Sequence, residues 1–251
     1  MTDNTPILTP QELLAYRRAT GALPQFNPPR AVIFAPQKSL AAYVLRRHPT
    51  RKISGFAGEF YLFKRTNGQV ALSTAFGIGA PVVAGLTDEF AALGVKEFAL
   101  IGMAGGLQPD LQTGSLVLST GAIRGEGTSR HYLPLAGTVE TSPEMTRAVS
   151  RILSGKNCPH ALGPTWTTDA PFREFRKDVL AHQTNGVLAV DMEAAAMLAV
   201  AKANHLPALA AFSIADTLAN GTWHMSRDLR KSQQGLTALF DSVLHHLTQT
   251  T

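Results

Sequence analysis

The sequence of 251 residues predicts an α/β fold in a single domain. Apolar, β-rich runs alternate with helical patterns along most of the chain. Two of these runs, residues 98–101 and 208–212, are continuously apolar, as in strands that are buried on both faces. Hydrophobic residues make up 45% of the chain and charged residues 16%, which is typical of a globular protein. The alternation predicts a mostly parallel sheet that helices cover on both sides.

The elements are expected in the following order. The first 30 residues are polar and contain five prolines, so residues 1–30 are interpreted as an N-terminal arm with one short helix over residues 11–20. Residues 31–251 form the α/β domain. Strands are expected at the apolar runs 31–35, 70–75, 98–104, 115–123, 161–168, 187–190 and 208–215. Helices are expected over residues 82–93, 192–204 and 226–247.

Composition excludes several classes of protein. No apolar run approaches the ~18–20 residues of a membrane span, and the first 25 residues contain no apolar signal-like segment, so we expect neither a membrane partner nor a signal peptide. Cys158 is the only cysteine, which suits a cytoplasmic location. The net charge is +5, but the basic residues are scattered and no aromatic residues lie between them. A nucleic-acid partner is therefore not expected.

Two glycine-rich turns follow predicted strands, at residues 76–81 and 102–106. Glycine permits positive φ and lets a ligand approach the main chain closely. Ligands of open α/β sheets bind at the carboxyl ends of the strands, where a following helix also offers free N–H groups. The two turns therefore indicate a shared ligand crevice. Each turn taken alone is equally consistent with a purely structural role, because neither matches a Walker loop or a dinucleotide fingerprint.

Several segments, in this order, resemble the nucleoside phosphorylase family, which includes the uridine and bacterial purine nucleoside phosphorylases and related nucleosidases. They are STAFGIGAP (73–81), LGVKEFALIG (93–102), GGLQPDLQTGSLV (105–117), EGTSRHY (126–132), VDMEAAA (190–196) and SIAD (213–216). The resemblance implies a central mixed β-sheet that forms a distorted barrel flanked by helices. It also implies a homo-oligomer, either a dimer or a trimer of dimers, in which neighbouring subunits complete each site.

The sugar-binding residues are expected at the start of the alanine-rich helix. A carboxylate such as that of Glu193 can accept hydrogen bonds from both ribose hydroxyls. The resemblance implies this catalytic, ribose-binding role for Glu193 and places Met192 against the sugar. His131 is a further candidate for lining the ribose site. The alternatives are that Glu193 is an acid favoured by the helix dipole, and that His131 is structural.

Asp216 ends an apolar strand, which makes it the candidate general acid for the leaving base. Burial raises the pKa of such a carboxyl toward working pH, whereas the alternative role is that of a helix N-cap. In the purine-cleaving branches of the family, an aspartate at this place contacts N7 of the purine. The resemblance therefore favours a purine over uridine as the base.

The segment of residues 167–174 resembles the part of the family that holds the base. Phe172 is expected to stack on the base, while Arg173, Glu174, Arg176 and Asp216 address its polar edge. The alternative is an exposed turn whose charges are solvated. Trp223 and His224 are candidates for a lid over the pocket, with a core or interface role for Trp223 as the alternative.

The pocket for phosphate or water is expected at Gly77, Gly79, Gly102 and Met103, with Lys38 as the nearest cation. The family's phosphate-binding arginines are absent here. The first would lie within residues 35–39, the second aligns with Gly58 and the third with Leu100. Arginine binds phosphate through a bidentate fork that lysine does not reproduce.

The resemblance implies cleavage of the N-glycosidic bond of a small-molecule nucleoside by phosphorolysis, which yields free base and ribose 1-phosphate. Inorganic phosphate is then the co-substrate, and no other cofactor is expected. No metal is expected, because His182, His205, His245 and His246 lack ligand spacing. The missing arginines keep a phosphate-independent nucleoside hydrolase open, with Glu59 as a stand-in for the residue that activates water. A non-catalytic nucleoside-binding protein is the second alternative.

Overall fold

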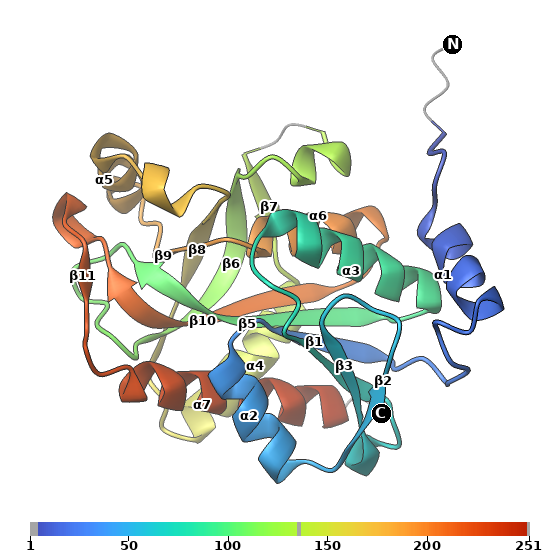
Figure 1. Cartoon of the computed structure of the whole chain (residues 1–251). Coiled ribbons are helices and arrows are strands. Elements are labelled where there is room, and N and C mark those ends of the chain that lie inside the picture. Colours follow the sequence, from blue (N-terminus) through green and yellow to red (C-terminus); the bar gives the residue numbers. More distant parts are fainter. Residues whose placement is uncertain (1–4, 135–136, 250–251) are drawn as a thin grey trace.

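The computed structural model describes residues 5–134 and 137–249, and one mixed sheet organises them (Figure 1). Its strands are β1 (Ala31–Ala35), β2 (Thr50–Ile53), β3 (Glu59–Phe63), β4 (Val70–Thr74), β5 (Glu97–Gly106), β6 (Leu116–Gly125), β7 (Thr138–Glu140), β8 (His160–Thr168), β9 (Ala189–Asp191), β10 (Ala208–Thr217) and β11 (His224–Met225). The helices are α1 (Pro10–Ala19), α2 (Lys38–Arg47), α3 (Ala80–Leu93), α4 (Pro143–Gly155), α5 (Arg176–Thr184), α6 (Ala194–Ala203) and α7 (Arg230–Gln249).

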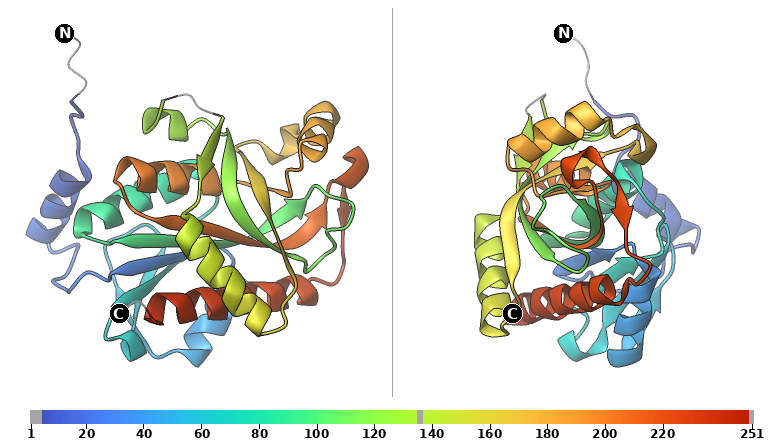
Figure 2. Two further views of the ribbon diagram at one scale, coloured as in Figure 1. Left: turned by 180° about the vertical axis from the view of Figure 1, so that it is seen from behind. Right: turned by 90° about the vertical axis from the view of Figure 1, so that its left-hand side faces the viewer.

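Five of the strands close into a barrel. The sheet runs from β10 through β6, β8 and β9 to β5, and β10 pairs again with β5, which completes the ring (Figure 2). Beyond β5 the sheet continues as an open wing through β1, β4, β3 and β2. The expected α/β fold, with a mixed sheet forming a barrel between helices, is confirmed.

The expectation of a mostly parallel sheet is wrong. Parallel pairs such as β1–β5 and β6–β8 alternate with antiparallel pairs such as β10–β6 and β5–β9. Closing the barrel and covering it with helices buries strands on both faces whatever their direction. A continuously apolar run therefore indicates a buried strand but does not determine its direction.

Two helical layers cover the two faces of the sheet. Successive side chains of β1 alternate between them: Val32 and Phe34 pack with α3 and α6, whereas Ile33 packs with α4 and α7. All three side chains are fully buried. Burial of a side chain of this size contributes about 1.5–3 kcal/mol, so each layer adds substantially to the stability of the strand that carries the site.

The expected strands and helices are all present, with ends shifted by a few residues. Elements that were not expected are β2, β3, β7, β11, α2, α4 and α5. A local signal does exist for α4, since the Ser142 side chain accepts from the backbone N–H of Met145 and Pro143 occupies the first turn. In the N-terminal segment Leu14 is buried, and Arg17 forms an ion pair with Glu89 of α3. The boundary at residue 30 stays a prediction.

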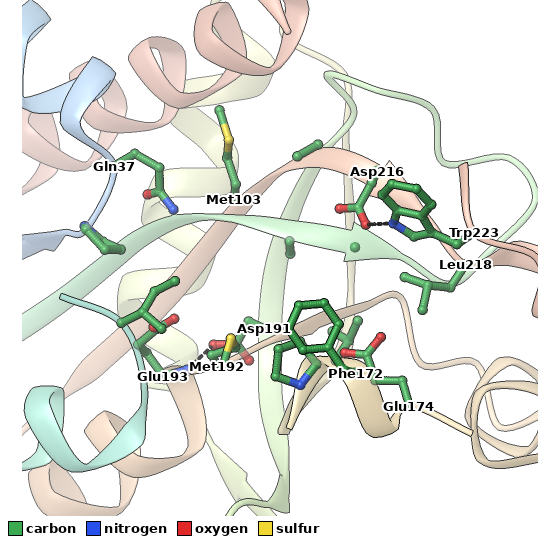
Figure 3. Close-up of a pocket in the computed structure, with 17 residues that line it drawn as sticks. Gln37, Met103, Phe172, Glu174, Asp191, Met192, Glu193, Asp216, Leu218 and Trp223 are labelled. Carbon is green, nitrogen blue, oxygen red and sulfur yellow. Dashed lines mark hydrogen bonds between the residues drawn. The ribbon is translucent and has the colours of Figure 1, made fainter. Parts of the chain in front are cut away.

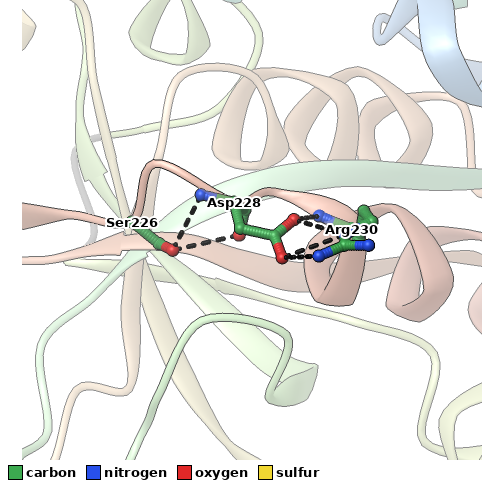
Figure 4. Close-up of polar contacts among 3 residues, drawn as sticks. All are labelled: Ser226, Asp228 and Arg230. Carbon is green, nitrogen blue, oxygen red and sulfur yellow. Dashed lines mark hydrogen bonds and ion pairs between the residues drawn. The ribbon is translucent and has the colours of Figure 1, made fainter.

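The last helix begins with a compact polar turn (Figure 4). Asp228 Oδ1 accepts from the backbone N–H of Arg230 at 2.9 Å, and Oδ2 pairs with the Arg230 guanidinium at 2.7 Å. The Ser226 hydroxyl accepts from the backbone N–H of Asp228. Because these groups are exposed, their ion pair adds little stability. The hydrogen bond from the Arg230 N–H to Asp228 marks the start of α7 after β11. No helix in the described ranges combines the length and apolarity needed to cross a membrane.

Candidate active site

A cavity of about 550 Å³ opens at the carboxyl ends of β5, β9 and β10, beside the turns after β1 and β4 (Figure 3). Small-molecule sites have volumes of roughly 300–1,000 Å³ and lie at this edge of such sheets. Both glycine-rich segments reach the cavity, the first through Ile78 and the second through Gly105. The expectation of a turn at residues 102–106 is wrong, because these residues form the end of strand β5. Six of the expected site residues line it: Met103, Phe172, Glu174, Met192, Glu193 and Asp216.

Glu193 is held at one end of the cavity by the first glycine-rich turn. The backbone N–H of Gly79 donates to Oε1 of Glu193 at 2.6 Å. Gly79 has a φ of 107°, a conformation that favours glycine, so this donor depends on the residue type at position 79. Burial, followed by the negative charge of Asp191, raises the pKa of Glu193 to about 7. Glu193 also lines the cavity, so its carboxyl faces a bound ligand.

Asp191 is the buried anchor beneath Glu193. It accepts from the backbone N–H groups of Glu193 at 2.9 Å and Ala194 at 2.6 Å, and from the Thr167 hydroxyl at 2.7 Å. Burial raises its pKa to about 6, against the lowering effect of these hydrogen bonds. These bonds fix the first turn of α6 and thereby the position of Glu193 and Met192. An aspartate just ahead of a helix is an N-cap signal, which is how sequence reasoning could have found it.

Asp216 lies at the other end of the cavity. β11 pairs with the end of β10, and this hairpin brings Trp223 beside Asp216. The indole N–H of Trp223 donates to Oδ2 of Asp216 at 2.7 Å, and both side chains line the cavity (Figure 3). Of the two lid candidates, Trp223 lines the cavity and His224 does not.

Glu174 and Phe172 complete this end of the cavity. Burial, followed by the charge of Asp216, raises the pKa of Glu174 to about 7. Phe172 is 98% exposed at the rim, so a ligand or another chain would cover apolar surface there. Two carboxyl groups and two aromatic rings, those of Phe172 and Trp223, therefore lie at this end of the cavity.

The remaining expected residues do not line the cavity. Arg173, Arg176, His131 and Lys38 are exposed outside it, and Arg176 packs near Gly221. Gly77 and Gly102 lie in the glycine-rich segments without reaching the cavity, and Gly79 acts through Glu193. Binding roles for these residues stay predictions.

The described lining of the cavity is acidic. It contains four carboxyl groups, those of Glu174, Asp191, Glu193 and Asp216, and neither lysine, arginine nor histidine. Opposite Glu193, Gln37 projects from the turn after β1, and its buried Oε1 has no hydrogen-bond partner. Within the described ranges, no cluster of three or more His, Cys, Asp or Glu side chains is placed to hold a metal ion.

Gly58 and Leu100, the two positions at which the family's arginines were expected, are both tightly packed. A Cβ on Gly58, whose φ is 74°, would lie 2.5 Å from the carbonyl oxygen of Thr74, so a side chain does not fit there. Leu100 is fully buried in the core beneath α3 and α6. Neither Gly58 nor Leu100 lines the cavity.

Sequence reasoning missed Gln37 and Leu218 as lining residues, whereas Ile78 and Gly105 lie in the two glycine-rich segments that predicted the crevice. Gly105 allows close packing, because a Cβ there would lie 2.5 Å from the Leu218 side chain. Gln37 stands directly before α2, a helix that was not expected. Gln37 and Leu218 come from segments far apart in the chain, and of these two only Gln37, which follows an apolar strand, gave a local signal.

Comparison with known proteins identifies relatives. A sequence model of the phosphorylase superfamily matches residues 29–245. Uridine phosphorylase of Haemophilus influenzae is 33% identical over 103 residues, which are 41% of each chain. Guanosine phosphorylase of Halorubrum lacusprofundi is 32% identical over 146 residues, 58% of this chain and 60% of that protein. Uridine phosphorylase of Escherichia coli is 26% identical over 156 residues, 57% of this chain and 62% of that protein. Each match thus covers less than two thirds of the relative's length.

Proposed function

Since the chain belongs to the phosphorylase superfamily, we propose that it is a pentosyltransferase that cleaves the N-glycosidic bond of a nucleoside by phosphorolysis, giving free base and ribose 1-phosphate. The observation that carries this proposal is one cavity with the buried carboxyl of Glu193 at one end and the carboxyls of Asp216 and Glu174, with two aromatic rings, at the other. The names of the relatives, uridine and guanosine phosphorylase, support the reaction type and leave the base open.

One end of the cavity binds the sugar in this proposal, and the other end binds the base. Glu193 accepts hydrogen bonds from the ribose hydroxyls, and Met192 packs against the sugar. The base lies between Phe172 and Trp223, with the carboxyl pair at its polar edge. As the C1′–N bond breaks, the sugar develops positive charge, which the ionised form of Glu193 stabilises, and the base accepts a proton.

Hydrolysis is the second candidate reaction, because the described lining contains no cation. A phosphate dianion beside four carboxyl groups would need positive charge from elsewhere, and charged hydrogen bonds to it contribute about 1.5–3 kcal/mol each. Water needs no such charge. In a homo-oligomer, either a dimer or a trimer of dimers, a neighbouring chain would supply this positive charge. The exposed side chain of Phe172 at the rim offers apolar surface that such a chain would cover. A cytoplasmic location belongs to the same proposal, supported by the single cysteine.

The test is product analysis of guanosine, inosine and uridine, each with and without inorganic phosphate. We expect free base only with phosphate, together with ribose 1-phosphate. Free base and free ribose at equal rates in both buffers would instead establish hydrolysis. Binding of a nucleoside by calorimetry without any product would establish a non-catalytic binding protein. Size-exclusion chromatography with light scattering measures the oligomer in the same preparations.

A further inference from the structure

We propose that Glu174 is the group that gives its proton to the leaving base, and that Asp216, held by Trp223, is its charged partner. This rests on the proposed cleavage of a nucleoside and reassigns the acid within it. It also names the class of substrate on which Glu174 matters: nucleosides whose base departs through a ring nitrogen that must be protonated.

The hydrogen bond between Trp223 and Asp216 distinguishes the two carboxyls at this end of the cavity. An indole N–H can only donate, so Oδ2 of Asp216, 2.7 Å away, faces it as an acceptor. The described residues give Glu174 no hydrogen-bond partner, and its carboxyl lines the same end of the cavity. Of the two carboxyls, Glu174 is therefore the one whose oxygens are both open to a ligand.

The surroundings of Glu174 favour its neutral form. Its pKa is raised to about 7, first by burial and second by the charge of Asp216 on β10. The other charged groups around it are Asp191 and Glu193 across the cavity, the exposed Arg173 and Arg176 on its own segment, and the exposed His224 on β11. Two nearby carboxyls without a cation between them hold a proton more readily than either would alone.

The proton transfer balances within the proposed reaction. The electron pair of the C1′–N bond moves onto the base while the O–H bond of Glu174 breaks, and its proton joins a ring nitrogen of the base. An oxygen of phosphate or water bonds to C1′ and releases a proton. That proton restores Glu174 once the base has left, and no oxidant or further reactant is needed.

The experiment compares two substrates across pH 5–9. One is the nucleoside that the wild-type protein cleaves fastest among guanosine, inosine and uridine; the other is 4-nitrophenyl riboside, whose phenolate leaves without a proton. For the wild type we expect a bell-shaped dependence of kcat/KM on pH for the nucleoside, with a rise as Glu193 ionises and a fall at high pH as Glu174 loses its proton, both near pH 7. We expect Glu174→Gln to lose roughly 100-fold on the nucleoside at pH 6, as is typical for loss of a general acid, and to lose this dependence on high pH. On the nitrophenyl substrate its loss should be less than about tenfold.

Two further variants keep the test sharp. Asp216→Asn removes the neighbouring charge, so we expect the high-pH fall to move to lower pH. Glu140→Gln makes the same exchange of carboxyl for carboxamide at an exposed position on β7 outside the cavity, and so controls for the substitution itself. Equal losses of Glu174→Gln on both substrates, or an unchanged high-pH fall, would overturn the proposal. If the wild type cleaves neither substrate, the proposed function itself fails, a result distinct from failure of the Glu174 assignment.

Discussion

Glu193→Gln should weaken catalysis and strengthen the fold at the same time. The substitution keeps an oxygen for the Gly79 N–H and removes the charge that serves the ribose hydroxyls. Loss of one charged hydrogen bond costs about 1.5–3 kcal/mol, which corresponds to a fall in kcat/KM of roughly 10- to 150-fold. Truncation to a smaller residue would confound this result, because it would leave the Gly79 donor unpaired.

The stability effect follows from the raised pKa of Glu193. Its value of about 7 in the folded chain exceeds the ordinary value of 4.5, so the folded state binds the proton more tightly. The wild type therefore loses stability as pH rises from about 4.5 through 7, and the uncharged glutamine does not. At pH 8 the gain of the variant is at most about 3 kcal/mol, whereas near pH 4 the two proteins should differ little.

The assays are kcat/KM on the best nucleoside and thermal unfolding at pH 5 and pH 8, with Glu140→Gln as the matched control. A gain of 1 kcal/mol raises the Tm of a chain of this size by about 2–4 °C. Unchanged kinetics would refute the ribose-binding role. A fall in both activity and stability at pH 8 would show that the carboxylate is structural and that the pKa argument is wrong.

Three other substitutions test the supports of the site. Gly58→Ala places a Cβ 2.5 Å from the Thr74 carbonyl oxygen at positive φ, so we expect the free energy of unfolding in urea to fall by about 1–3 kcal/mol. A fall of less than about 0.5 kcal/mol, the size typical of surface substitutions, would contradict the packing. Thr167→Val removes the hydroxyl that donates to Asp191 and accepts from the Ala195 N–H. The free energy of unfolding should therefore fall by about 1–3 kcal/mol, and kcat/KM should fall as well. Unaltered stability would argue against this anchor. Trp223→Phe keeps an aromatic ring but removes the N–H that Asp216 accepts, so kcat/KM should fall up to about tenfold with little change in Tm; full activity would exclude a positioning role.

Much of the fold can be predicted from local patterns. The apolar runs at β1, β5 and β10 predict buried strands, because burial on both faces requires apolar side chains at successive positions. Strand direction cannot be predicted this way, which is why the mixed pairing of β6 with β10 and β8 was missed. The short antiparallel strand β2 carries two charged residues and gave no apolar run, whereas the apolar residues 60–63 of β3 were not recognised as a strand.

Some residues of the candidate site could likewise be predicted from local sequence, and others could not. Glu193 and Asp216 stand at the ends of recognisable strands, so their position at the carboxyl edge of the sheet follows from the sequence. Arg173 and Arg176 share a segment with Glu174, yet only Glu174 turns into the cavity. Residues one or two positions apart can face opposite ways, and composition does not decide between them.

The sequence by itself determined the family, the α/β class and the two carboxyl groups at the strand ends, because these depend on residues that are neighbours in the chain. Only the tertiary structure decided that five strands close into a barrel, that Trp223 binds Asp216, and that the described cavity lining is acidic. These features depend on which distant segments meet when the barrel closes. Burial and neighbouring charge, which raise the pKa values of Glu174 and Glu193, exist only after those segments have met.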